Sequence, residues 1–142
     1  MIKKEDDPIN EVKDEIDSAI KDPRGLVFHQ KRLAFCLSLG ITDLLERYIK
    51  NKNALKPGEK IDHRWLKKSK PNFKEILANK VTLPLAQLDK LDKIIDTAYK
   101  IELRRNELAY GKQASEKLLK DLINIFLETK KEVENDWYNS IC

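Results

Sequence analysis

An apolar segment between about Leu26 and Lys52 constrains the fold of this chain more than any other feature. Its apolar residues recur at spacings of three and four, with Phe28, Phe35 and Leu39 widening a stripe made of Leu33, Leu37, Ile41, Leu44, Leu45 and Tyr48. A helix that is apolar over most of its circumference is typical of the centre of a bundle. Gly40 inside this helix costs about 1 kcal/mol relative to alanine. We therefore expect another helix to cross closely at Gly40.

The rest of the composition also favours helices. Four glycines and five prolines in 142 residues are too few for the many turns of an all-β fold. Apolar residues make up 41% of the chain and charged residues 37%, which suits helices with one buried stripe and a charged outer face. The apolar residues are clustered and periodic, which excludes a disordered chain.

In the first half of the chain, three further features are predicted. A helix begins near Pro8 and is broken at residues 22–25, with Ile9, Val12, Ile16, Ala19 and Ile20 recurring along it. Residues 61–66 are a short helix or a docking loop, from which Trp65 plugs the end of the bundle. Another short helix follows Pro71, with Phe73, Ile76, Leu77 and Val81 as its apolar positions.

In the second half, two long helices are predicted. The first has Pro84 near its start, covers residues 85–110 and stops at Gly111, with Leu88, Leu91, Ile94, Ile95, Ala98, Tyr99 and Leu103 as its apolar stripe. The second covers residues 114–133, with Leu118, Leu122, Ile123, Phe126 and Leu127 facing inward. Trp137 and Tyr138 then end a polar tail, where they fold back or meet a partner. The prediction is an all-α fold, an up-down bundle of about four to five helices in a single domain over residues 1–142.

Several kinds of chemistry are not indicated. Phosphate-loop, dinucleotide-binding and nucleophile-elbow patterns are missing, so no cofactor is implied. Cys36 lies in an apolar run as a small core side chain, and Cys142 is the last residue, so neither suggests a disulfide or a metal. His29 and His63 stand alone, and we expect surface or capping roles for them and no metal site.

The predicted location is the cytoplasm. The first residues lack an apolar leader, and nowhere do 18 uncharged apolar residues run together, so no membrane segment is expected.

Positive charge is concentrated in the middle of the chain. Residues 53–80 carry eight basic and three acidic side chains, although the whole chain carries only +4. Lys67, Lys68 and Lys70 form the densest part of this segment, and they are candidate nucleic-acid-binding residues. The alternative, a solvated connection between helices, stays open.

One stretch combines residue types that bind phosphodiesters: Glu102-Leu-Arg-Arg-Asn-Glu-Leu-Ala-Tyr-Gly111. The guanidinium groups of Arg104 and Arg105 suit phosphate, the Asn106 amide can hold a phosphate or a base edge, and the Tyr110 ring can stack on a base. In the alternative interpretation, both arginines complement the negative C-terminal end of the helix and Tyr110 is merely packed. Composition alone favours this alternative.

The residues from Arg105 to Gly111 resemble the motif of the HEPN superfamily, in which an Arg-Asn pair is followed, four residues after the Arg, by a histidine. The resemblance implies a small helical bundle, commonly a homodimer that brings two motifs together in a cleft. Many members are metal-independent ribonucleases of toxin–antitoxin and defence systems, often paired with a small nucleotidyltransferase. Arg105 and Asn106 match the motif.

Tyr110 stands where the family has its histidine. A histidine can exchange protons near neutral pH, while an ordinary phenol, with a pKa of about 10, is a poor base there. Tyr110 could still donate a proton or orient a 2′-hydroxyl at a reduced rate. His29 or His63 would have to approach the motif in space to replace the missing group.

Three hypotheses follow. The favoured one is a HEPN-like homodimer that binds RNA or a nucleotide at the motif, with ribonuclease activity weak or lost. The runner-up is a non-catalytic helical bundle that docks a partner protein through its basic middle and aromatic tail. The third is a nuclease that uses Tyr110 or a recruited group. The sequence leaves open whether the chain is an enzyme.

Overall fold

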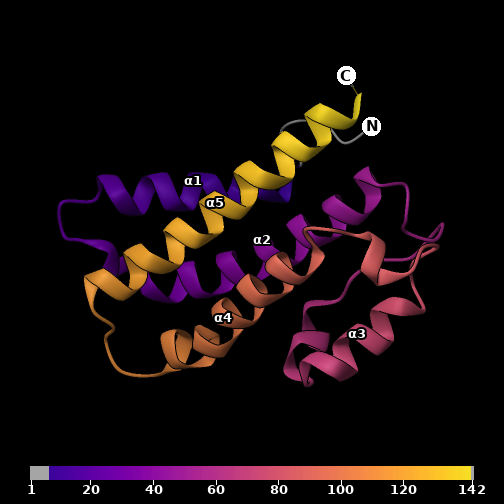
Figure 1. Ribbon diagram of the computed structural model, residues 1–142. Coiled ribbons are helices and arrows are strands. Elements are labelled where there is room, and N and C mark those ends of the chain that lie inside the picture. Colours follow the sequence, from indigo (N-terminus) through magenta and orange to yellow (C-terminus); the bar gives the residue numbers. More distant parts are fainter. Residues whose placement is uncertain (1–6, 142) are drawn as a thin grey trace.

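The computed structural model describes residues 7–141, with side chains described as far as Asp136, and its helices pack together (Figure 1). The α-helices are α1 (Pro8–Lys21), α2 (Gln30–Asn51), α3 (Lys70–Ala78), α4 (Leu91–Tyr110) and α5 (Glu116–Ile141), and the 3-10 turns are η2 (Leu26–His29), η3 (His63–Lys67) and η4 (Leu85–Gln87). No strand occurs in the described range, where Leu55 and Val81 form one isolated antiparallel bridge. The all-α prediction is confirmed.

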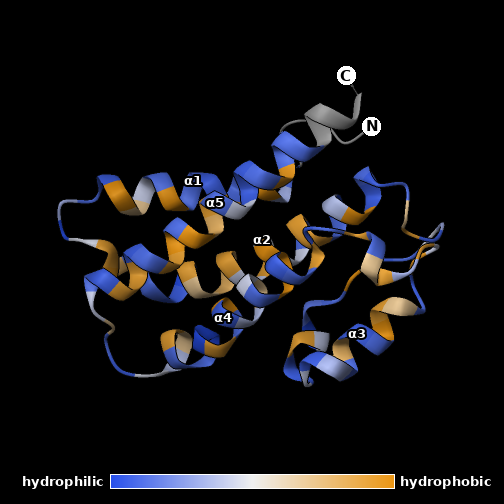
Figure 2. Cartoon of the chain, in the orientation of Figure 1, coloured by the Kyte–Doolittle hydropathy of each residue, from blue (hydrophilic) through white to orange (hydrophobic). Residues whose placement is uncertain are grey.

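Helix α2 is the centre of the bundle, as its apolar circumference predicts. It packs against α1, α4 and α5, while α3 lies to one side with η3 (Figure 1). Helices α1 and α4 run antiparallel to α2. Helix α5 runs parallel to α2. Glu116 at the start of α5 accepts a hydrogen bond from Val27 N just before α2, and Asp136 near the end of α5 pairs with Lys52 just after α2. Because α1 and α5 each pack on α2 with one side, apolar residues alternate with polar ones along both helices (Figure 2).

The close crossing expected at Gly40 is present. A Cβ atom at this position would lie 2.7 Å from Cε1 of Phe126 on α5 and 3.1 Å from Cγ2 of Val12 on α1. Phe126 is fully buried, so its ring has little room to retreat. Glycine therefore lets α1 and α5 approach α2 at the same level.

The start of the central helix differs from its prediction. The segment begins with the 3-10 turn η2, and the α-helix starts only at Gln30. His29 interrupts the helical geometry with φ −109° and ψ 9°, while both of its ring nitrogens face carboxylates. At the end of α1, Asp22 precedes Pro23 and takes the extended conformation that a following proline favours.

The helix predicted for residues 85–110 begins later, at Leu91. Leu88 lies in the core outside any helix, with φ −97° and ψ 89°, and the preceding residues form the separate turn η4. The buried Tyr48 hydroxyl accepts a hydrogen bond from Lys90 N at 3.0 Å and donates one to Asp89 at 2.8 Å. Tyr48 thus fixes the start of α4, and burial raises the pKa of its phenol to about 12.

The last helix also differs from its prediction. It starts at Glu116, where the Ser115 hydroxyl accepts a hydrogen bond from Leu118 N, and it continues to Ile141. The polar tail predicted after Val133 is therefore helical. The side chains of Trp137 and Tyr138, and all of Cys142, lie outside the described residues.

Several apolar positions are not buried as predicted. Phe28, Leu39, Leu103 and Ile20 are exposed, and Cys36 is only half-buried. Burial nevertheless raises the pKa of the Cys36 thiol. Trp65 is half-buried on η3 and packs against the core. The exposed residues lie outside the sectors of their helices that the neighbouring helices cover.

Candidate functional site

The predicted motif lies at the C-terminal end of α4, where a buried glutamine holds the chain. Gly111 ends the helix, and its N–H donates to Glu107 O at 2.7 Å. Gln30 Nε2 donates to Leu108 O and Lys112 O, and Gln30 Oε1 accepts from Ala114 N at 2.7 Å. This single side chain of α2 therefore fixes both sides of the turn between α4 and α5.

Two aromatic and two cationic side chains gather beside this turn, and we call Lys31, Phe35, Arg105 and Tyr110 the motif corner. The rings of Phe35 and Tyr110 meet edge to face with centroids 6.2 Å apart. The Arg105 guanidinium lies 4.9 Å from the Phe35 centroid, and Lys31 Nζ lies 5.6 Å from the Tyr110 centroid. Neither cation forms an ion pair with any of the described residues.

The alternative interpretation of the motif is wrong in two respects. Tyr110 is 73% exposed, so it is not merely packed. The last turn of α4 contains no basic residue, so the arginines do not complement the helix end. Arg104 instead pairs with Glu107 at 3.0 Å, which offsets its charge locally.

Asn106 does not belong to the motif corner but to a groove on another side of α4. This open groove, of about 770 Å³, is lined by Leu66, Lys67, Lys68, Ser69, Lys70, Asp96, Tyr99, Lys100, Glu102, Leu103 and Asn106. We call it the lysine groove. The three lysines singled out in the sequence therefore line the same groove as Asn106, whereas Arg105 and Tyr110 do not line it.

The histidines do not complete the motif. His29, expected at the surface or at a cap, is buried, with only 6% of its surface exposed. Its Nδ1 lies 3.0 Å from Glu15 Oε1 and its Nε2 lies 2.9 Å from Asp22 Oδ2. Hydrogen bonds with Glu15 and then Asp22 raise the pKa of His29. Both ring nitrogens are thus engaged in tying α1 to η2.

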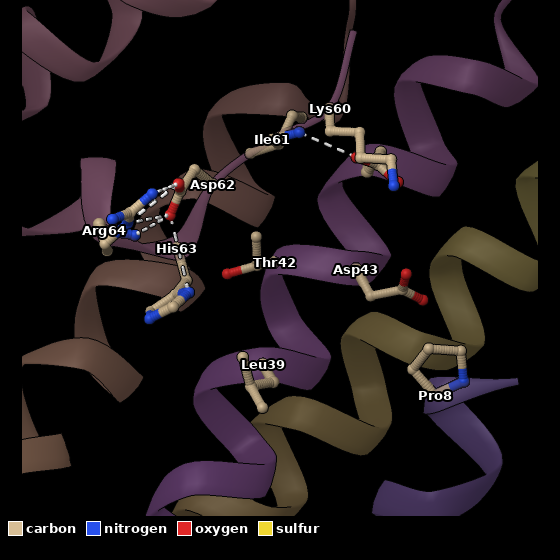
Figure 3. Close-up of a pocket in the computed structure, with 10 residues that line it drawn as sticks. Pro8, Leu39, Thr42, Asp43, Lys60, Ile61, Asp62, His63 and Arg64 are labelled. Atoms are coloured by element: carbon tan, nitrogen blue, oxygen red, sulfur yellow. Dashed lines mark hydrogen bonds and ion pairs between the residues drawn. The ribbon is translucent and has the colours of Figure 1, made fainter. Parts of the chain in front are cut away.

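His63 lines a third site, a groove of about 640 Å³ between α2 and the loop before η3 (Figure 3). Nearby, Glu46 accepts a hydrogen bond from Ile61 N at 2.8 Å, and Asp62 is held by Arg64, which lowers the pKa of that carboxyl to about 2. The Glu46 contact joins the loop to α2, and the Asp62–Arg64 pair lies within the segment itself. None of the four motif-corner residues lines the groove that contains His63.

Two further findings bear on the chemistry available. Among the described residues, no three His, Cys, Asp or Glu side chains are placed to hold a metal ion. No helix in that part of the chain is long and apolar enough to cross a membrane.

The described residues form an all-α protein of five packed helices that carries an exposed aromatic and cationic corner. No family model, curated protein or solved structure matches it. The HEPN resemblance therefore rests on the seven residues from Arg105 to Gly111.

Sequence reasoning missed three residues of this region. Lys31 and Phe35 join the motif corner from α2, and Gln30 holds the turn. The sequence marked only Phe35, as an aromatic residue at the edge of the apolar stripe of the central helix, and it did not indicate a binding role. Nothing in the sequence alone pairs α2 with the end of α4 in this register.

Proposed function

We propose that this chain is a HEPN-like helical domain that binds single-stranded RNA at the motif corner. The observation that carries the proposal is the exposed Tyr110 ring, with Lys31 over its face and Arg105 over the adjoining Phe35 ring. Neither cation forms an ion pair with a described residue. Single-stranded nucleic acids bind where bases stack on aromatic rings and nearby cations follow the phosphates. Phe28 is exposed on η2 with Arg24 4.6 Å from its ring centroid, but this arginine is paired with Asp22 at 2.8 Å.

Ribonuclease activity at this corner is weak or lost in our proposal. Acid–base cleavage of RNA needs a group that takes a proton from the 2′-hydroxyl, and histidine is the usual one. Tyr110 occupies the motif position of that group. Neither His29 nor His63 replaces it, because the first is held by two carboxylates and the second lines another groove.

The test is binding and cleavage of labelled single-stranded RNA without metal. Tyr110→Ala removes the stacking surface and should weaken binding by about 1–3 kcal/mol, the usual contribution of one base on one ring. Tyr110→Phe keeps the ring and should retain most of the binding. Arg105→Ala should also weaken it, with a smaller dependence of affinity on salt.

Arg32→Ala is the matched control, because Arg32 is an exposed arginine of α2 whose nearest carboxylate, Glu15, lies 4.0 Å away on α1. Binding that falls with Tyr110→Ala and Arg105→Ala but not with Arg32→Ala supports the proposal. Unchanged RNA affinity in both corner variants would refute it. Cleavage by the unaltered protein that Tyr110→Phe abolishes would make the chain a nuclease that uses the phenol.

A specific observation also favours the alternative, a non-catalytic bundle that docks a partner chain. Phe28, Phe35 and Leu39 follow one another along one edge of η2 and α2, and Leu103 and Tyr110 lie seven residues apart on α4. All except Phe35 are exposed, and the Phe35–Tyr110 contact joins the two rows into what we call the α2–α4 face. Exposed apolar surface of this kind marks protein interfaces. We propose a second copy of the chain as its partner, with a nucleotidyltransferase as the other candidate that the HEPN resemblance implies.

A further inference from the structure

The lysine groove lies beside α4 and has a charge that its own residues do not balance. Lys67, Lys68 and Lys100 are exposed and form no hydrogen bond or ion pair through their ammonium groups with any described residue. The fourth lysine is already paired, because Lys70 Nζ lies 2.6 Å from Asp96 Oδ1. With Glu102 as the remaining acid, the groove carries an excess of two positive charges.

The walls of the groove are fixed by contacts between elements distant in the sequence. The Tyr99 hydroxyl on α4 donates to Lys68 O at 2.6 Å, which ties the link between η3 and α3 to α4. The Tyr99 ring packs edge to face on the fully buried Phe73 of α3. Ser69, which also lines the groove, caps α3 by accepting a hydrogen bond from Asn72 N. The lysines therefore project from a braced backbone.

The groove also offers groups that suit an organic molecule rather than a bare anion. Leu66, Leu103 and the Tyr99 ring supply apolar surface, and the Asn106 amide can both donate and accept a hydrogen bond. Its volume of about 770 Å³ lies in the range of small-molecule sites. A ligand with a phosphate end and an uncharged ring would satisfy both the cations and the apolar wall.

We propose that the lysine groove binds a small organic phosphate of nucleotide size, with its phosphates on Lys67, Lys68 and Lys100. The ring of the ligand lies against the Tyr99 ring, within reach of Asn106. This site is separate from the motif corner, because none of the four corner residues lines it. The inference goes beyond the proposed function and does not depend on RNA binding.

The test is calorimetric titration of the full chain with ADP and with inorganic pyrophosphate, which share a diphosphate but not a ring. ADP should bind more tightly than pyrophosphate. The double variant Lys67→Gln, Lys100→Gln should weaken ADP binding by about tenfold or more, as expected for two lost charged contacts worth about 1.4 kcal/mol together. Asn106→Ala should reduce the preference for ADP over pyrophosphate.

Lys120→Gln is the matched control, because Lys120 is an exposed lysine of α5 without a partner among the described residues. Lys120→Gln and Tyr110→Ala should leave ADP affinity unchanged. Equal affinity for ADP and pyrophosphate, or equal losses in the groove and control variants, would overturn the proposal. So would a groove that fails to bind ADP but whose double variant weakens RNA binding, because the lysines would then belong to an RNA surface.

Discussion

At the scale of single residues, His29 shows how a polar side chain can be held in the interior. It contacts Glu15 on α1 and Asp22 at the end of α1, and Arg24 in turn binds Asp22 and holds the pKa of that carboxyl well below its usual range. The charged imidazole is stabilised because a carboxylate faces each ring nitrogen. Arg32 of α2 also faces Glu15, with its Nη1 4.0 Å from Glu15 Oε1.

The change in the pKa of His29 on folding predicts that the stability of the protein depends on pH. Because the pKa of His29 is raised above 6.5 by folding, its contribution is complete below pH 6.5 and is lost as the pH rises through the folded-state pKa. The contribution of Asp22 is present above its unfolded value of 3.8 and is lost only at lower pH. We expect the free energy of unfolding in urea to fall between pH 6 and pH 9, and His29→Gln to remove most of this fall. His63→Gln, which alters a half-buried histidine without two carboxylate partners, should preserve it.

At the scale of helices, Gly40 sets the distance between α2 and its neighbours α1 and α5. Gly40→Ala would gain about 1 kcal/mol in helix propensity. Its new methyl group would meet Phe126 and Val12 at contact distances that a packed core does not accommodate, at a cost of about 1–3 kcal/mol. We therefore expect a net loss of up to about 2 kcal/mol, measured by chemical denaturation.

A double-mutant cycle separates crowding from other causes. Phe126→Leu shortens the side chain that the new methyl group would strike, so the cost of Gly40→Ala should be smaller in the Phe126→Leu background. Equal costs in both backgrounds would show that the crossing at Gly40 is not what limits residue size there.

At the scale of the whole molecule, the exposed α2–α4 face predicts self-association. Leu39 is 55% and Leu103 78% exposed. If a second copy covers this face, sedimentation should give the mass of a dimer for the unaltered chain, and the double variant Leu39→Glu, Leu103→Glu should be a monomer with an unchanged helical spectrum. A control at Ile20→Glu, an exposed apolar residue of α1, should remain dimeric. A monomeric unaltered chain at high concentration would rule out this use of the face.

Local patterns predicted much of the fold. The periods of three and four along residues 33–48 indicated the central helix, and Pro8 and Gly111 marked a helix start and a helix end that the structure contains. These features depend on neighbours in the chain, which a sequence displays directly. The boundaries at Gln30 and Leu91 could not be read in this way. The first boundary depends on the contacts of His29 with two carboxylates, and the second on the hydrogen bond from Lys90 N to the Tyr48 hydroxyl.

The sequence by itself determined the class of fold and the residue types of the motif, because helical period and side-chain chemistry are local properties. Only the tertiary structure decided how those residues are grouped. Arg105 faces Phe35, whereas its neighbour Asn106 lines the lysine groove, because successive residues of a helix point about 100° apart. Which surface each residue meets depends on how α4 is rotated against α2, and Gln30, Ser38 and Tyr48 fix that rotation through contacts between residues far apart in the chain.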